Sequence, residues 1–235
     1  MCDIAISTAA FCLWDIGPER KLNICMELGF NRIVIAFSTL KMLRQFASSP
    51  MLCEKLAQFN NVMIHAPWCG INYKNNKATK DIFTHLEMIV QKVKIDAVIF
   101  HFDCIKDWSQ FRDCSFPYYI KNPNHASWQT FDEALNQHGF DSVLDINRSI
   151  RFENYIDKYL DHHGEQIRAI HVSGFIDELG RTPIVESGQM ELLNKVKQVN
   201  APIIIEGLFS PGDFQGIREE IKVIQDSVMG NACFF

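Results

Sequence analysis

The sequence predicts a single α/β domain over residues 1–235, a closed (β/α)8 barrel of parallel strands alternating with helices. Short apolar runs rich in β-branched residues recur between longer segments that have helical spacing. Successive runs start 20 to 35 residues apart, the length of one strand and helix together, and no strand-turn-strand hairpin signal lies between them. No glycine-rich nucleotide-binding turn follows the first run, which favours the barrel over an open doubly wound sheet.

The expected strands and several helix ends are marked in the chain. The eight strands are expected in the runs DIAIS from residue 3, RIVIAF from 32, VMIHAP from 62, AVIFHF from 97, PYYIKN from 117, SVLDIN from 142, AIHVSG from 169 and PIIIEG from 202. Pro18 and Gly29 bound the first expected helix, and Ser127 and Gly139 cap the one after the fifth strand. The segment after the fourth strand has room for only a turn or two of helix. No linker or low-complexity tract divides the chain, so one domain is expected.

The composition is that of a globular protein of the cytoplasm, with 47% hydrophobic and 22% charged residues and a net charge of −5. The acidic balance argues against nucleic acid as a partner, because phosphate neutralisation needs a basic face. No run approaches the ~18 apolar residues of a membrane span, and the first residues lack the pattern of an export signal. The eight cysteines are scattered without a C-x-x-C pair, which indicates reduced thiols.

Six of the eight expected strands end on an ionisable residue. Because active sites of such barrels form at the carboxyl ends of the strands, these side chains are expected to meet in one pocket. Burying so many ionisable groups is costly unless they bind a ligand, hold a metal or pair with one another. Three imidazoles and two carboxylates suit one divalent ion such as zinc or manganese, and a metal-free site is the alternative. The six residues are His65, His101, Lys121, Asp145, His171 and Glu206, of which all but Lys121 are possible metal ligands.

The stretches VMIHAPW, VIFHFD, YYIKNPN, VLDINR, AIHVSGF, RTPIVESG and IIIEG lie within residues 61 to 207 in this order. With them the chain resembles the xylose-isomerase-like TIM-barrel superfamily, which includes sugar isomerases, epimerases and endonuclease IV. The resemblance implies metal ligands at His65, His101, Asp145, His171 and Glu206.

Three positions depart from the pattern of that superfamily. Lys121 stands where its members carry a metal-binding glutamate, and Arg148 and Arg181 stand where they carry histidines. A guanidinium offers no lone pair to a metal, and an ammonium offers one only after losing a proton. The trinuclear zinc site of an endonuclease IV is therefore not expected here.

The resemblance implies an isomerase or epimerase that moves a proton next to the carbonyl of a small sugar, sugar phosphate or related compound. Glu206 would be the base and Lys121 the electrophile, with Asp145 and His171 beside them. Arg148 and Arg181 would bind a phosphate or carboxylate of the substrate. All four tryptophans, including Trp128, fall in segments after strands. Trp14, Trp68 and Trp108 would form an aromatic wall for the substrate, and the alternative is that they only cap the top of the barrel.

Two other functions stay open at this point. One is a hydrolase, such as an endonuclease IV-like phosphodiesterase, that keeps one metal on part of the ligand set. The other is a catalytically inactive binding protein in which Lys121 only pairs with the carboxylates. In each case a small carbohydrate or phosphorylated molecule is the expected partner, a membrane is not, and the oligomeric state is open.

Overall fold

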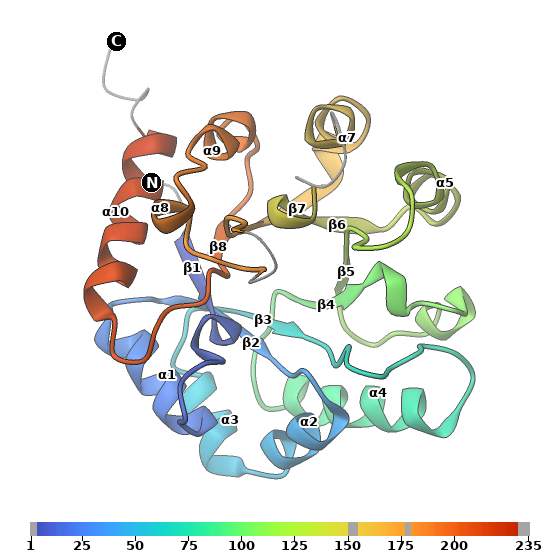
Figure 1. Cartoon of the computed structure of the whole chain (residues 1–235). Coiled ribbons are helices and arrows are strands. Elements are labelled where there is room, and N and C mark those ends of the chain that lie inside the picture. The colour runs from blue at the N-terminus through green and yellow to red at the C-terminus, as the bar shows by residue number, and fades with distance from the viewer. Residues whose placement is uncertain (1–3, 150–154, 177–179, 230–235) are drawn as a thin grey trace.

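The predicted barrel is confirmed by a computed structural model that describes residues 4–149, 155–176 and 180–229. Eight parallel strands close into a barrel in sequence order, with β8 paired to β1 (Figure 1). The strands are β1 (Ile4–Ser7), β2 (Arg32–Ala36), β3 (Asn61–His65), β4 (Ala97–His101), β5 (Tyr118–Lys121), β6 (Asp141–Asp145), β7 (Ile167–Val172) and β8 (Ile203–Ile205).

Helices form a ring outside the strands (Figure 1). The α-helices are α1 (Pro18–Glu27), α2 (Leu40–Ala47), α3 (Pro50–Leu56), α4 (Lys77–Val90), α5 (Trp128–His138), α6 (Ile146–Ser149), α7 (Tyr155–His163), α8 (Ile184–Ser187), α9 (Glu191–Val196) and α10 (Phe214–Met229). The 3-10 helices are η1 (Thr8–Phe11), η2 (Phe102–Cys104), η3 (Trp108–Phe111) and η4 (Gly164–Gln166). Only η2 and η3 follow β4, as the short segment there predicts.

The predicted helix caps are confirmed at α1 and α5. Pro18 opens α1, and Gly29 beyond its end has a φ of +82°, a left-handed conformation that favours glycine. The Ser127 hydroxyl accepts a hydrogen bond from the Thr130 amide at 3.2 Å. Gly139 ends α5 with a φ of +62°. These local signals fix where each helix begins and ends.

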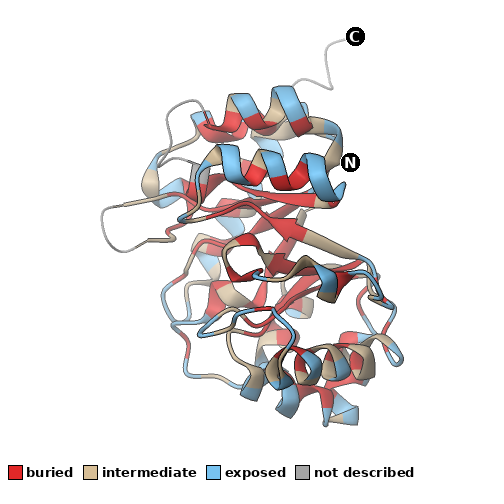
Figure 2. Ribbon diagram, turned by 90° about the vertical axis from the view of Figure 1, so that its right-hand side faces the viewer, coloured by how far each residue is buried: buried red, intermediate tan, exposed pale blue. Residues whose placement is uncertain are grey.

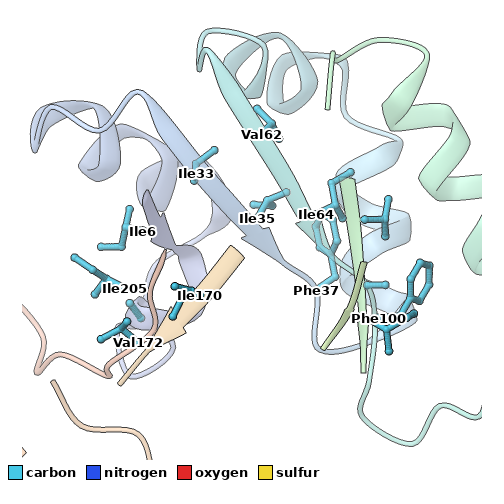
Figure 3. Close-up of a cluster of buried hydrophobic side chains, with 14 of the residues drawn as sticks. Ile6, Ile33, Ile35, Phe37, Val62, Ile64, Phe100, Ile170, Val172 and Ile205 are labelled. Carbon is cyan, nitrogen blue, oxygen red and sulfur yellow. The ribbon is translucent and has the colours of Figure 1, made fainter. Parts of the chain in front are cut away.

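The strands carry apolar side chains on both sides, which is why they appear in the sequence as short continuous apolar runs. Residues such as Ile33, Ile35 and Val62 belong to the main hydrophobic core between strands and helices (Figure 3). Figure 2 shows the strands buried over most of their length and the helices buried on one side. A barrel of strands covered on its outer face by helices is the arrangement expected for parallel strands.

A second, smaller core fills the barrel itself and sets the height of the functional side chains. Its members are one residue from each strand, namely Ala5, Val34, Met63, Ile99, Tyr119, Val143, Ala169 and Ile204. Because side chains of a strand alternate in direction, the residue two positions later faces the same interior. Those later residues are Ser7, Ala36, His65, His101, Lys121, Asp145, His171 and Glu206. A polar layer therefore lies directly above an apolar floor.

The segment before α8 packs closely against the end of β8. The Leu208 amide donates to the Arg181 carbonyl at 2.9 Å, and Gly174 and Thr182 pair through both backbone hydrogen bonds. A Cβ atom on Gly207 would lie 2.7 Å from the Cα of Pro183. Only a glycine permits this approach.

No helix in the described part of the chain is long and apolar enough to cross a bilayer.

We expect Gly207→Ala to lower the free energy of unfolding by about 1–3 kcal/mol, because the new methyl group overlaps backbone atoms. Gly164→Ala is the matched control, since a Cβ there meets nothing within 4 Å and the glycine does not have a positive φ. Urea titrations of both variants measure the difference. Equal stability of the two variants would contradict the close packing at Gly207.

Candidate active site

Four successive strands bring four ionisable side chains together at the carboxyl end of the barrel. Lys121 ends β5, Asp145 ends β6, His171 lies near the end of β7, and Glu206 directly follows β8. All four are almost completely buried, with at most 3% of their surface exposed. Charged groups removed from water to this extent must find partners within the protein.

The Lys121 ammonium lies in the middle of the other three side chains. Its Nζ is 2.9 Å from Asp145 Oδ2, 2.8 Å from Glu206 Oε2 and 2.7 Å from His171 Nδ1. An ammonium has three donor hydrogens and no acceptor, so three acceptors satisfy it completely. Lys121, the charged residue that ends the apolar run of β5, is therefore the centre of the site.

His171 makes a contact that has two proton arrangements. Its Nδ1 is 2.7 Å from Lys121 Nζ and 2.8 Å from Glu206 Oε1. A neutral imidazole nitrogen either accepts from the ammonium or donates to the carboxylate. Burial lowers the pKa of His171, so the neutral form is favoured. Nε2 of the same ring is buried with no hydrogen-bond partner in the described structure.

Arg181 covers the carboxylates from the segment before α8. One guanidinium nitrogen, Nη1, pairs with Glu206 Oε2, and Nη2 donates to Asp145 Oδ2 at 2.5 Å. The fork thus bridges the two carboxylates. With a quarter of its side chain exposed, Arg181 lies closer to solvent than either carboxylate.

Arg148 approaches Asp145 from α6, which begins directly after β6. Its Nε is 3.2 Å from Asp145 Oδ2, and its Nη1 donates to the Asn122 carbonyl at 2.7 Å. The remaining nitrogen, Nη2, lies 2.8 Å from His101 Nδ1, which accepts this hydrogen bond. All three nitrogens of Arg148 are thus engaged inside the protein.

The two other histidines continue that chain of hydrogen bonds. With His101 accepting at Nδ1, its Nε2 donates to His65 Nε2 at 3.0 Å, and His65 Nδ1 faces the Ala66 carbonyl at 3.3 Å. Burial first, and the neighbouring cations next, hold the pKa of both rings well below the usual histidine value. Both imidazoles are therefore neutral, and their lone pairs are already used.

The cations determine the charge states of the buried carboxylates. Burial alone would raise the pKa of Asp145, but the surrounding cations outweigh it and hold that pKa far below the ordinary range. Glu206 behaves in the same way. Burial, reinforced by Arg181, lowers the pKa of Lys121 to about 8 although the two carboxylates oppose the shift. At neutral pH both carboxylates are ionised and Lys121 is mostly protonated.

A divalent metal does not fit this arrangement as it stands. Asp145, His171 and Glu206 form a plausible ligand group, with ligand atoms within 4.8 Å of one another. The space among those atoms holds the Lys121 ammonium, and Arg181 takes oxygens of both carboxylates. A divalent ion would have to displace both cations. His65 and His101 do not join this group, because each uses its acceptor nitrogen in the histidine chain.

The site opens into a cavity of about 600 Å³. Trp68 lines it and stacks on His101 at 5.3 Å between ring centroids. The other two predicted wall residues lie elsewhere. Trp14 is buried and donates from Nε1 to the Phe209 carbonyl, and Trp108 stacks against the rings of His138 and Phe140.

Three polar residues at this site were not predicted from the sequence. Asn122 follows Lys121 and binds the Asp145 backbone, accepting from its amide at 2.6 Å. Asp103 accepts from the backbone amides of residues 124–126 and so holds the loop after β5. Lys21 of α1 lines the cavity. Lys21 was detectable, because the first turns of barrel helices lie at the same end as the strand ends.

Comparison with known proteins gives structural matches alone. No family model matches the chain, and no curated protein matches it by sequence. An endonuclease IV from Thermus thermophilus has a TM-score of 0.65 at 12% identity, over 97% of this chain and 98% of its own. A probable 3-DHS dehydratase, AsbF from Bacillus anthracis, has a TM-score of 0.61 at 11% identity, over 95% and 98%.

A D-psicose 3-epimerase solved in the presence of D-fructose has a TM-score of 0.58 at 11% identity, over 97% of this chain and 96% of its own. These matches agree with the xylose-isomerase-like resemblance seen in the sequence. At such identities they establish the fold, and their titles name three different reactions. The chemistry has to be argued from the residues of this chain.

The depressed carboxylate pKa values make stability depend on pH. Asp145 and Glu206 bind protons more weakly in the folded chain than at their unfolded values of about 3.9 and 4.3. Their contribution is therefore fully present above about pH 5 and is lost as the pH falls below about 4. Circular dichroism during an acid titration measures the loss.

Removing the central cation should move this acid transition to higher pH. Lys121→Met leaves the buried carboxylates with fewer cations, and we expect a loss of about 3–5 kcal/mol at neutral pH as well. Lys195→Met is the control, because it breaks an exposed ion pair with Asp157 and should cost less than about 1 kcal/mol. An unchanged acid midpoint in Lys121→Met would contradict the central role of the ammonium.

Proposed function

We propose that this chain is a sugar isomerase-like or epimerase-like enzyme that moves a proton next to the carbonyl of a small hydroxy-carbonyl substrate. In this proposal Lys121 supplies the positive charge that a divalent metal would otherwise supply. The observation that carries it is the Lys121 ammonium at 2.7–2.9 Å from Asp145, His171 and Glu206. Fixed positive charge at a developing oxyanion is the main source of catalysis in such proton transfers.

Lys121 and Arg181 would stabilise the enediolate that forms when the substrate loses its proton. Both are donors, and both line the cavity. Arg181 also has the exposure needed to turn from the carboxylates toward a substrate oxygen. A negative oxygen entering between them would compete with Asp145 and Glu206 for their hydrogen bonds.

Glu206 would take the proton from carbon. Its low pKa keeps it in the basic form, but the same cations make it a weak base in the resting site. When a substrate oxyanion draws Lys121 and Arg181 away from it, the pKa of Glu206 rises toward the range that proton transfer needs. Binding and base strength are coupled in this way.

His171 would hold and return the proton. Its Nδ1 is within hydrogen-bond distance of both Glu206 Oε1 and Lys121 Nζ. A proton taken by Glu206 can therefore be shared with the imidazole before it is delivered to a second carbon or oxygen. In an isomerase the proton goes to the neighbouring carbon and the hydroxyl proton moves between the two oxygens, whereas an epimerase returns a proton to the opposite face of the same carbon.

A specific observation favours one other candidate, a binding protein of the same fold. Asp145 and Glu206 already have cationic partners from this chain, so the site is satisfied without a substrate. Carboxylates that are fully paired with cations of the same protein are also expected when a protein loses its catalytic activity and keeps its fold. The metal-dependent phosphodiesterase is less well supported, because the ligand atoms are occupied by cations.

Hydrogen exchange tests the proposal without assuming a product. We expect a panel of aldoses, ketoses, their phosphates and hydroxy acids to include a compound whose C–H signal is lost in deuterated water, measured by proton NMR. Glu206→Gln should abolish that exchange, and Lys121→Met should slow it at least about 100-fold by removing an oxyanion donor. Lys195→Met should leave it unchanged.

Three results would contradict the proposal. Exchange that persists in Glu206→Gln would remove the assigned base. Exchange that depends on added divalent metal would remove Lys121 as its replacement. Binding of a panel compound with no exchange at all would favour the binding protein.

A further inference from the structure

Among the described lysine and arginine side chains that line the main cavity, Lys21 alone has no hydrogen-bond or ion-pair partner. It lies in the first turns of α1, across the barrel mouth from β5, and it lines the main cavity. No hydrogen bond or ion pair of its ammonium occurs in the described structure, whereas Lys121, Arg148 and Arg181 are each paired with a carboxylate. Burial lowers the pKa of Lys21, with only the Cys12 and Cys25 thiols opposing the shift.

The balance of charge around the cavity gives Lys21 a specific role. Four cations, Lys21, Lys121, Arg148 and Arg181, face three carboxylates, Asp103, Asp145 and Glu206. His65 and His101, which form the chain of hydrogen bonds described above, are neutral. Among the lysine, arginine and carboxylate side chains the excess is a single positive charge, and it resides on Lys21. A ligand with one negative charge would balance the site, whereas a phosphate of nearly two charges would not.

A smaller apolar pocket adjoins the main cavity at Lys21. It has a volume of about 140 Å³, and its walls include Ile16, Ile35, Phe46 and Leu52. Both cavities are lined by a shared group of residues, namely Thr8, Lys21, Ala36 and Met42. The pocket has room for a short aliphatic group, because most of its lining residues are apolar and only Thr8, Lys21 and Gln45 are polar.

We infer that Lys21 binds the carboxylate of a monoanionic substrate that carries a short aliphatic group in the adjoining pocket. The inference rests on the proposed function, which it narrows from sugars in general to hydroxy or oxo acids. It also gives the carboxylate-binding role to Lys21, since Arg148 is paired with carboxylates of this chain and Arg181 is assigned to the oxyanion of the substrate. The carbonyl of such a substrate would extend across the barrel mouth toward Lys121.

Simple carboxylates test this subsite separately from catalysis. We expect acetate, propionate and butyrate, titrated into the whole chain and followed by NMR, to bind with affinity rising about fourfold per methylene group. Inorganic phosphate should bind more weakly than butyrate. Lys21→Met should weaken butyrate at least about tenfold, because the charged hydrogen bond is lost. Lys21→Arg, which keeps the charge, should stay within about threefold of the original chain.

Lys41→Met is the matched control, because Lys41 is an exposed lysine of α2 that lines neither cavity. Its affinity for butyrate should equal that of the original chain. Affinity independent of chain length, tighter binding of phosphate, or equal binding by Lys21→Met would each overturn the inference. Butyrate binding that depends on Lys21, without hydrogen exchange in any compound of the panel, would refute the proposed function and leave the subsite standing. Exchange in sugars but in no hydroxy or oxo acid would leave the proposed function standing and overturn the inference.

Discussion

The contact of the Lys121 ammonium with Asp145, Glu206 and His171 is the constraint on which the rest of the site depends. Each of these groups would be costly to bury alone, and together they satisfy one another. A one-residue shift of β5 in the barrel would turn Lys121 away from this centre and leave two carboxylates short of a cation. Strand register and site chemistry are therefore mutually dependent.

The surrounding residues follow from this centre. Two carboxylates carry one more negative charge than one ammonium balances, and the Arg181 guanidinium supplies it, while Arg148 lies between Asp145 and Asp103. Arg181 can bridge both carboxylates because its segment is held against β8, where Gly207 allows Pro183 to approach. Arg148 in turn orders His101 and His65. The same cations that neutralise the carboxylates thus also fix the hydrogen bonds of the residues around them.

Much of this was predictable from the sequence. Polar residues two positions beyond an apolar barrel residue must share its interior, so the meeting of Lys121, Asp145, His171 and Glu206 follows from strand periodicity. Spacing could not show that His65 and His101 use their lone pairs on each other and on Arg148. That outcome depends on side-chain reach between two strands and a helix.

The directions of the tryptophan side chains also could not be predicted from the sequence. A position after a strand tells which end of the barrel a residue occupies but not the direction of its side chain. Trp68 faces the cavity, whereas Trp14 and Trp108 pack beside it against other aromatic rings. Lys21 is the opposite case, since its helix position was visible but its lack of a partner needed the full set of contacts.

The most direct test is crystallographic. Crystals of protein purified without chelator and grown with millimolar zinc or manganese, measured at the absorption edge of the metal, would show what lies among Asp145, His171 and Glu206. We predict density for the Lys121 nitrogen with no anomalous peak, and a peak in Lys121→Glu crystals treated alike. An anomalous peak in the original protein, with ligand atoms at about 2.0–2.2 Å and Lys121 displaced, would contradict the account.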